Sequence, residues 1–498
     1  MGSYTLLEPF GRDQGIHATI AYALDEGLIT YRDVYNIKPP LTTAMHWISQ
    51  ELFGHSMMAI RALDLLVTAL TACALVEVGR TLKKGAAFAF LAPVTFTTIY
   101  YSYNFWSHAQ TDGWAGFLVV FAFWSMLAAW RRGAGVPRFT LMLLSGALLG
   151  LAFGLKYTIG ATGGLVFAPL LARLLGATNV RFHFSDLFAN VLGGIAVLTA
   201  VSGTMALAGA LAPFLEIQSF IRGYVGYVAQ TPPAFLDEIF LPGQHSQHLE
   251  VLIGVMALVA LLDASRAHSP LGVVAGLIWY AAAWLSGSIQ GKGFAYHYLP
   301  LVPAHAFMIG LGAEALLARI PAGSIRRMTI LISAAAVYLP SIAAQNAVLV
   351  ASLSQMPDPK ASYYSTFRAS SDFDINGTLA FAETLRARRN PEDKLFVWGY
   401  ETMLYFLVES PPHYRYVYNW PFMVSYYDGR YTEDLLTRLR ADPPAQFVVQ
   451  KEDATPWVTY REESSDQMLH EYPALEAFLR DNYHLVSSEP KYDLYEIN

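Results

Sequence analysis

Long apolar stretches alternate with short polar segments over the first 350 residues of this chain. Ten stretches of roughly 15 to 25 residues, each about the length that crosses a ~30 Å hydrocarbon layer, lie near residues 57–79, 86–103, 110–130, 139–155, 159–175, 187–211, 249–263, 271–288, 297–318 and 328–350. The pattern predicts a polytopic α-helical membrane protein with about ten spans over residues 1–350. Residues 351–498 have a different pattern and form a separate predicted domain.

The C-terminal segment alternates two periodicities. Strand-like runs (KLFVWGY, AQFVVQ, YDLYEI) are interleaved with helix-like ones (DINGTLAFAETLRARR, TEDLLTRLRA, PALEAFLRDNY), which is typical of a small α/β domain. Charge changes at the same place. The first 350 residues carry 35 charged side chains, whereas the last 148 carry 37, a density usual for a water-soluble domain.

Basic residues in the short loops predict the orientation. Loops on one face hold twelve of them: Arg80, Lys83, Lys84, Arg131, Arg132, Arg138, Arg173, Arg181, Arg266, Arg319, Arg326 and Arg327. The intervening loops hold only Lys156, Arg222 and Lys292. Because short cytoplasmic loops are enriched in Lys and Arg, the first loop (1–56), the loop 212–248 and the C-terminal domain are predicted to be extracytoplasmic. The aromatic and apolar residues of both loops predict helices lying in the membrane interface.

Composition excludes several functions. The 498 residues are 54% hydrophobic and 14% charged, with a mean hydropathy of +0.33, which argues against an ordinary cytosolic enzyme. A net charge of −6 argues against nucleic acid as a partner. The single cysteine, Cys73, allows no intramolecular disulfide. Walker A, GxGxxG, HExxH, CxxC and GxSxG motifs are absent from the sequence, which disfavours ATP hydrolysis, dinucleotide chemistry and zinc proteolysis.

The first outer loop contains the strongest candidates for chemistry. Asp13, in a Gly-flanked turn, is a candidate base; the alternative, favoured two to one by spacing alone, is a solvated or helix-capping Asp. Lys38 precedes two prolines that keep its backbone extended, so its ammonium is equally suited to holding an anion or to snorkelling toward lipid headgroups.

Three further charges lie at the outer ends of predicted spanning helices. Arg61 and Asp64 are spaced to pair with each other, although charges inside a membrane are functional candidates by default. Asp112 either faces the same cleft as Asp13 or interacts with a helix dipole.

A second outer loop, QGKGFAYHYLPLVPA, presents Lys292, Tyr296 and His297, which suit recognition of a phosphate or a sugar; the alternative is an interfacial aromatic belt with a snorkelling lysine. Lys156, in the turn GLKYTIG, is a weaker candidate of the same kind. Gly146, Gly150 and Gly154 repeat every four residues, which favours helix packing over chemistry.

Taken together, the acidic first loop, the segment Tyr31-x-Asp33-x(4)-Lys38-Pro-Pro-Leu, the following FG and an Arg opening a helix form a recognisable pattern. It resembles the GT-C superfamily of polytopic glycosyltransferases, in particular bacterial relatives of the dolichyl-phosphate-mannose protein mannosyltransferases and of the lipid A aminoarabinose transferase. The acidic residue in TDG, the HYLP segment and the outer tail also fit. In that family a spanning helix precedes the acidic loop, so the resemblance implies either a start placed too late or a fragment.

The resemblance implies transfer of a sugar from a polyprenyl-phosphate carrier to a lipid, glycan or protein acceptor outside the cytoplasm, with inversion, in a bacterial inner membrane. Asp13 would be the base and Asp112 the second acidic residue. Lys38, with Arg61 or Lys292, would hold the donor phosphate, while His297, Tyr296, Lys156 and Asp33 are possible substrate contacts.

The resemblance implies no required cofactor besides the lipid-linked donor. In the aminoarabinose branch a metal-associated Glu precedes the lysine, whereas Ile37 stands here; this argues against a metal on that pattern, without excluding a divalent ion. The alternative functions are a transporter or flippase of lipid-linked sugars, which would show paired halves with interrupted helices, and a membrane scaffold for the tail.

Overall fold

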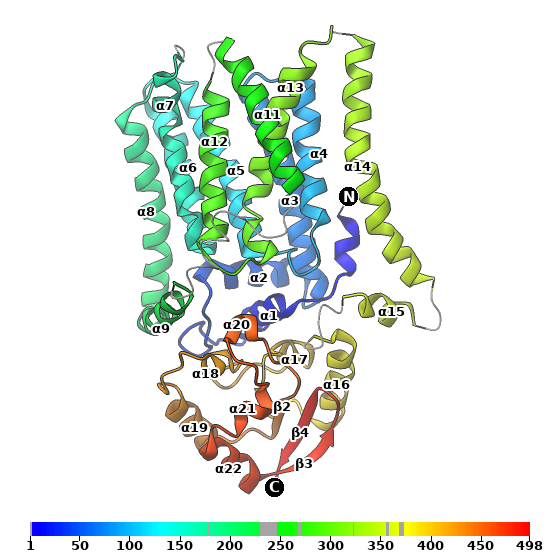
Figure 1. The fold of residues 1–498 in the computed structure, drawn as a ribbon. Coiled ribbons are helices and arrows are strands. Elements are labelled where there is room, and N and C mark those ends of the chain that lie inside the picture. Colours follow the sequence, from blue (N-terminus) through cyan, green and yellow to red (C-terminus); the bar gives the residue numbers. More distant parts are fainter. Residues whose placement is uncertain are drawn as a thin grey trace.

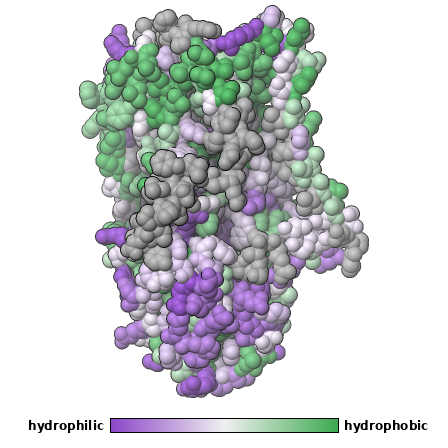
Figure 2. Space-filling view, in the orientation of Figure 1, coloured by the Kyte–Doolittle hydropathy of each residue, from purple (hydrophilic) through white to green (hydrophobic). Residues whose placement is uncertain are grey.

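A computed structural model of the chain describes residues 2–177, 180–229, 247–266, 270–321, 323–354, 358–367 and 373–498. Figure 1 shows an upright helical bundle, a layer of short helices across its lower end, and a small mixed domain beneath that layer. In Figure 2 hydrophobic residues gather on the bundle, while hydrophilic ones dominate the C-terminal domain. The surface thus changes from mainly apolar on the bundle to mainly hydrophilic on the C-terminal domain.

All ten apolar stretches form helices where the structure describes them. The elements are α3 (Met57–Thr81), α4 (Ala86–Ser102), α5 (Thr111–Trp130), α6 (Val136–Leu155), η2 (Tyr157–Phe167) with α7 (Ala168–Leu174), α8 (Phe184–Leu207), α11 (Gln247–Arg266), α12 (Leu271–Ser288), α13 (Leu301–Leu317, after the short η3, Ala295–Tyr298) and α14 (Ser324–Leu353).

Within the described part of the chain, six segments are long and apolar enough to cross a membrane: α3, α5, α6, η2 with α7, α8 and α12. The chain is therefore an integral membrane protein by the length and composition of its helices. Crossing by α4, α11, α13 and α14 stays a prediction.

One predicted span differs from expectation. The sequence predicts one helix over residues 159–175, but an eleven-residue 3₁₀ segment, η2, precedes the seven-residue α7. Gly160, Gly163 and Gly164 fall in η2, and glycine weakens an α-helix by roughly 1 kcal/mol relative to alanine. The tighter winding starts directly after Lys156, so this lysine lies at a break between two helical segments.

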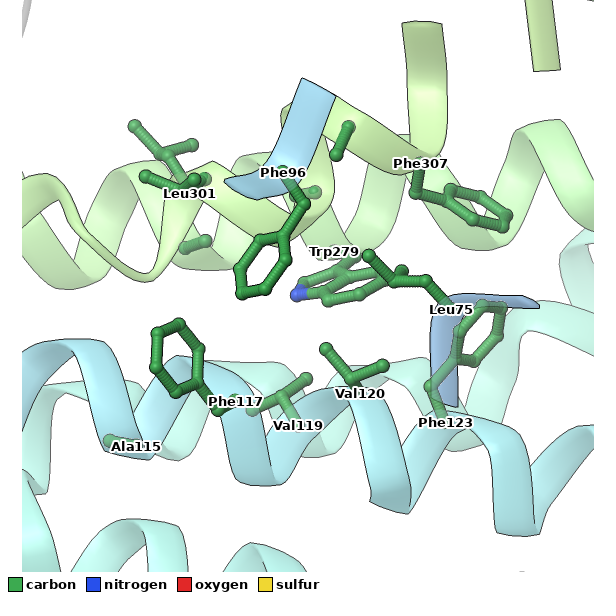
Figure 3. Close-up of a cluster of buried hydrophobic side chains, with 14 of the residues drawn as sticks. Leu75, Phe96, Ala115, Phe117, Val119, Val120, Phe123, Trp279, Leu301 and Phe307 are labelled. Carbon is green, nitrogen blue, oxygen red and sulfur yellow. The ribbon is translucent and has the colours of Figure 1, made fainter. Parts of the chain in front are cut away.

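Aromatic side chains fill the centre of the bundle (Figure 3). Trp279 of α12, Phe123 of α5 and Phe307 of α13 are all completely buried. The Phe123 ring centroid lies 5.5 Å from that of Trp279 and 5.4 Å from that of Phe307, which are favourable aromatic separations.

Close glycine contacts join two neighbouring helices. A Cβ on Gly146 of α6 would lie 1.8 Å from the Asn190 carbonyl oxygen of α8, and a Cβ on Gly150 would lie 3.0 Å from that of Gly194. The helix-packing interpretation of the glycine repeat is confirmed at these two positions, whereas Gly154 packs against Leu41 of α2 (Pro40–Phe53).

The two predicted interfacial segments are helical. After η1 (Ser3–Leu7), the first loop forms α1 (Arg12–Asp25) and α2, which lie across the lower end of the bundle in Figure 1. Trp47, Leu52 and Phe53 of α2 are exposed, as expected for a helix at a membrane surface. The segment 212–248 begins as α9 (Leu211–Ala229); its residues 230–246 lie outside the described residues.

The C-terminal domain contains a four-stranded sheet in the order β1-β2-β4-β3. The strands are β1 (Leu395–Trp398), β2 (Gln446–Gln450), β3 (Tyr483–Ser488) and β4 (Tyr492–Ile497); β1 and β2 are parallel, and the other pairs are antiparallel. The helices are α15 (Pro359–Ser365), α16 (Ile375–Arg388), α17 (Met403–Leu407), α18 (Trp420–Met423), α19 (Thr432–Ala441), α20 (Pro456–Thr459), α21 (Ser465–Leu469) and α22 (Pro473–Asn482). The α/β prediction is confirmed, with β3 as an additional edge strand.

This domain docks on α1. The Thr19 hydroxyl donates to the Thr402 carbonyl at 2.8 Å, and a Cβ on Gly15 would lie 2.9 Å from the Met403 side chain. An ion pair of 3.0 Å between Arg415 and Glu216 ties the domain to α9. The C-terminal domain is thereby held against α1 and α9 of the body.

Candidate functional site

A cavity of about 540 Å³ lies where the loops of the body meet the C-terminal domain. This volume is within the usual range for small-molecule sites. Six residues singled out from the sequence line it: Asp13, Lys38, Lys156, Lys292, Tyr296 and His297. Segments almost 300 residues apart in the sequence therefore converge on one site.

Asp13 and Lys38 form an ion pair in the cavity wall. The Lys38 Nζ lies 3.4 Å from the Asp13 carboxylate, and each side chain is 25% exposed. Gly11, not Asp13, occupies the N-cap of α1, and Asp13 lies in the first turn. Burial raises the pKa of Asp13, but Lys38, His17 and Lys156 together lower it by more, with Lys38 contributing both its charge and a hydrogen bond, so the net pKa lies below the ordinary value. The carboxylate is ionised at neutral pH, as a base must be.

The backbone around Lys38 is held in place. The Tyr31 hydroxyl donates to the Lys38 carbonyl at 2.7 Å, and the Lys38 N–H donates to the Asn36 side chain at 3.0 Å. Pro39 then caps α2, whose first residue is Pro40. A proline at the first helical position sacrifices no intrahelical hydrogen bond, so the sequence Lys-Pro-Pro fixes where the ammonium enters the cavity.

Asp112 lies behind the cavity, next to Lys156. Their side chains are 3.1 Å apart, with Asp112 only 1% exposed. The Gln290 amide also donates to Asp112 at 3.1 Å. Asp112 is in the first turn of α5, where a carboxylate interacts favourably with the helix dipole. Asp112 thus connects Lys156 to the loop that carries Lys292.

Lys292 bridges the body and the C-terminal domain. Its Nζ donates to the Trp457 carbonyl at 3.1 Å and lies 4.7 Å from the Tyr224 ring centroid and 4.9 Å from that of Tyr460. Burial, with a smaller contribution from the positive charge of Lys38, lowers the pKa of Lys292 to about 8. This ammonium is held at the rim by aromatic rings from both parts of the chain.

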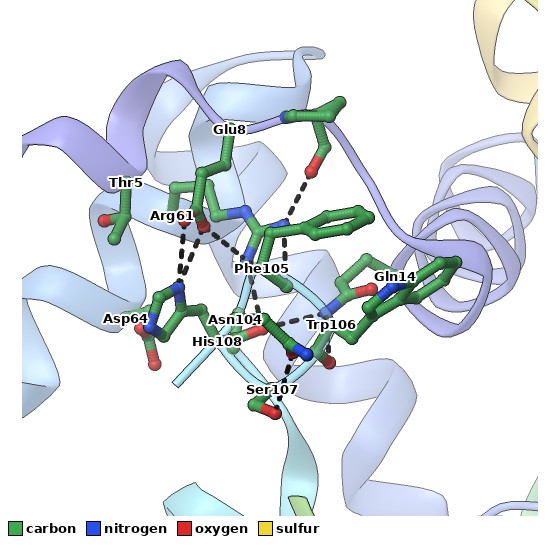
Figure 4. A network of polar contacts seen from close by, with 12 residues as sticks. Thr5, Glu8, Gln14, Arg61, Asp64, Asn104, Phe105, Trp106, Ser107 and His108 are labelled. Carbon is green, nitrogen blue, oxygen red and sulfur yellow. Dashed lines mark hydrogen bonds and ion pairs between the residues drawn. The ribbon is translucent and has the colours of Figure 1, made fainter. Parts of the chain in front are cut away.

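Arg61 lies elsewhere, in a buried polar network (Figure 4). Its guanidinium donates to the carbonyls of Pro9, Phe105 and His108 and lies 3.4 Å from the Glu8 carboxylate. The sequence predicted that Arg61 could pair with Asp64. In the structure Asp64 instead accepts hydrogen bonds from Tyr100 and Trp114, both at 2.8 Å. Arg61 therefore secures the loop before α5, and it is absent from the described lining of the cavity.

Asp33 is also outside that lining. Its carboxylate accepts a hydrogen bond from the Ile29 N–H at 2.9 Å and pairs with Arg32 at 2.7 Å. These bonds close the turn that leads to Lys38. Asp33 shapes the segment of the motif without reaching the cavity.

The sequence did not reveal the contribution of the C-terminal domain to this site. Tyr400, Tyr418, Trp420 and Thr455 line the cavity, but nothing in their local sequence indicates where the domain docks. Arg12 also lines it, with its guanidinium 5.5 Å from the Tyr400 ring centroid; its position beside Asp13 was an available signal.

The acidic residues of the site face ammonium groups, which does not suit a divalent cation. Among the described residues, no group of three or more His, Cys, Asp or Glu side chains is placed to hold a metal ion. At the position before Lys38, the hydrocarbon side chain of Ile37 lines the cavity. The donor set present fits an anion better than a metal.

Comparisons with known proteins agree with the expected family. Residues 37–206 match the family model of dolichyl-phosphate-mannose-protein mannosyltransferases. The fold is similar to ArnT from Cupriavidus metallidurans bound to undecaprenyl phosphate, with a TM-score of 0.54 and 17% identity over 99% of this chain and 95% of that one. The apo state of the same protein gives 0.54 and 16%, over 98% and 94%. No curated protein matches the chain.

Proposed function

We propose that this chain, which has the fold of the GT-C glycosyltransferases, transfers a sugar from a polyprenyl-phosphate carrier to an acceptor hydroxyl at the outer face of a bacterial inner membrane. One observation carries the proposal. Among the residues that the structure describes, five charged side chains line the cavity, and four of them, Arg12, Lys38, Lys156 and Lys292, are cationic. The fifth is the carboxylate of Asp13. Such a site suits a lipid phosphate together with a reacting hydroxyl.

In this proposal Lys38 and Lys156 stabilise the charge that the departing phosphate gains. Fixed cations in a partly dehydrated site are effective because they need no reorganisation during the reaction. Lys292 holds the phosphate at the rim, where the Tyr224 and Tyr460 rings keep its ammonium in place. Arg61 and Asp33 are assigned structural roles.

Asp13 is the proposed base. The Asp13 carboxylate lies 3.4 Å from the Lys38 Nζ. In the proposed complex the donor phosphate also contacts this ammonium, so Asp13 and the phosphate share Lys38. When the phosphate takes over part of this interaction, the pKa of Asp13 rises. The carboxylate then accepts the acceptor's proton more readily, at the moment when the donor is in place. Attack on the anomeric carbon from the side opposite the phosphate inverts its configuration.

The C-terminal domain is proposed to select the acceptor. Tyr400, Tyr418 and Trp420 contribute aromatic rings to the cavity lining, and such rings pack on the apolar faces of sugars. The similar ArnT from Cupriavidus metallidurans binds undecaprenyl phosphate in its crystal structure, which supports a polyprenyl phosphate as the carrier here.

The proposal is tested by incubating the protein in proteoliposomes with a panel of radiolabelled polyprenyl-phosphate sugars. Consumption of one donor, with release of free polyprenyl phosphate and label on an acceptor, is expected. Movement of an intact donor across the bilayer without cleavage would instead support a transporter. A donor that is neither cleaved nor moved, although it binds, would contradict both functions.

A further inference from the structure

A second cavity, of about 460 Å³, lies at the end of the bundle away from the C-terminal domain. Residues from the ends of α3, α5, α11, α12 and α13 line it, at the upper end of Figure 1. Of the described residues, the charged ones in its lining are Lys83, Lys84, Arg131 and Asp263. These three cations and one carboxylate give the cavity an excess of positive charge. Its described lining has no residue in common with that of the 540 Å³ cavity, called the reaction cavity below.

The start of a helix also lies at this cavity. Leu271, Gly272 and Val273 line it and form the first turn of α12. The first N–H groups of a helix lack acceptors within the helix, and they favour anions. The backbone of this turn is not crowded at Gly272, because even an added Cβ would lie 3.6 Å or more from its nearest neighbours.

Trp130 gives an independent indication of a ligand. It lines the cavity and is 5% exposed. Its indole N–H is buried and has no hydrogen-bond partner among the described residues. A buried donor without an acceptor is costly, so an acceptor from a bound molecule would satisfy it. Arg131, by contrast, already donates to the Thr81 carbonyl at 2.9 Å.

We propose that this cavity binds the phosphate of an anionic phospholipid from the leaflet opposite the reaction cavity. Lys83, Lys84, the start of α12 and the Trp130 indole would receive the headgroup. Leu82, Leu127 and Leu311 supply apolar walls beside it, which suit the adjoining acyl chains. Basic pockets between helices at a membrane surface are known to select such headgroups.

Native mass spectrometry of the full chain in detergent, titrated with dioleoylphosphatidylglycerol or dioleoylphosphatidylcholine, tests this site. One phosphatidylglycerol should bind in preference to phosphatidylcholine. The variant K83Q/K84Q should bind it roughly 20- to 30-fold more weakly, since each basic residue contributes about a factor of five. Trp130→Phe, which keeps the ring and removes the donor, should weaken it several-fold. Arg327→Gln, an exposed change at the start of α14, is the matched control and should have no effect.

Equal retention of the two lipids, or equal binding by K83Q/K84Q and the original protein, would overturn the proposal. Loss of binding in Lys38→Gln alone would also overturn it, because the lipid would then occupy the reaction cavity. Soluble glycerol phosphate is the remaining probe. If it bound as tightly as the lipid, the site would be one for a free phosphate ester and not for a phospholipid.

Discussion

Replacing Lys156 by Gln separates the structural and the chemical roles of the reaction cavity. The change leaves the Asp112 carboxylate, 1% exposed, without its ammonium partner at 3.1 Å. At an effective dielectric constant of ~20, the attraction over this distance is about 5 kcal/mol. Removing one partner of a buried pair typically costs about 3–5 kcal/mol. We therefore expect Lys156→Gln to lower the free energy of unfolding by that amount.

The double variant D112N/K156Q is the matched control. Its two amides are neutral, so no unpaired charge is buried, and stability should return to within about 2 kcal/mol of the original protein. Activity should not return, because the cation that faces the departing phosphate is still absent; a loss of about 100-fold is expected.

Two measurements on the same preparations decide the outcome. Thermal unfolding in detergent reports stability, and single-turnover sugar release reports chemistry. If the double variant recovered both, Lys156 would have only a structural role. If Lys156→Gln unfolded at the same temperature as the original protein, the argument from burial would be refuted.

Three other changes have distinct expected results. Lys292 has a pKa of about 8 and loses its charge above that pH, so kcat/KM should fall as the pH rises through about 8. The variant Lys292→Arg stays charged, so its pH–rate profile should show activity retained at pH 9. Arg61→Met removes the guanidinium that lies 3.4 Å from the buried Glu8, which keeps its contact with His108, and also removes the donor to the Pro9 carbonyl. Chemical denaturation should therefore show a loss of about 3–5 kcal/mol, while kcat per folded molecule changes little; a 100-fold loss of kcat would place Arg61 in the chemistry. Gly146→Ala should lower the unfolding temperature, because the new methyl would meet the α8 backbone at 1.8 Å, whereas Gly163→Ala, with nothing within 4 Å, should leave it unchanged.

The sequence predicted the parts of the fold that depend on local patterns. Apolar runs located the helices, and the loop bias in Lys and Arg separated their ends: Lys83, Lys84 and Arg131 line one cavity, and Lys156 and Lys292 line the other. The prediction of a single α-helix was wrong at η2, where an apolar run of helical length contains three glycines and forms a 3₁₀ segment. It also missed β3, whose pairing with β4 is a contact between segments.

For the site, residue types were predictable and partners were not. Asp13 and Lys38 were recognisable from their motif, and they are within 3.4 Å of each other. Arg61, a charge at the start of a spanning helix, was an equally good candidate for the site by sequence. Its partner in the structure, however, is Glu8, 53 residues earlier in the chain. Tyr418 and Trp420 reach the cavity only because α17 packs on α1. Such docking is a property of the assembled surface that no short segment encodes.

The most direct test of the proposed chemistry is the rate of sugar transfer by Asp13→Asn at saturating donor. The amide preserves the shape of the side chain and removes its capacity to accept the acceptor's proton. With donor binding measured separately by equilibrium titration, we predict a loss of at least about 100-fold in the single-turnover rate and little loss of binding. A rate within a few-fold of the original protein would contradict the assignment of Asp13 as the base.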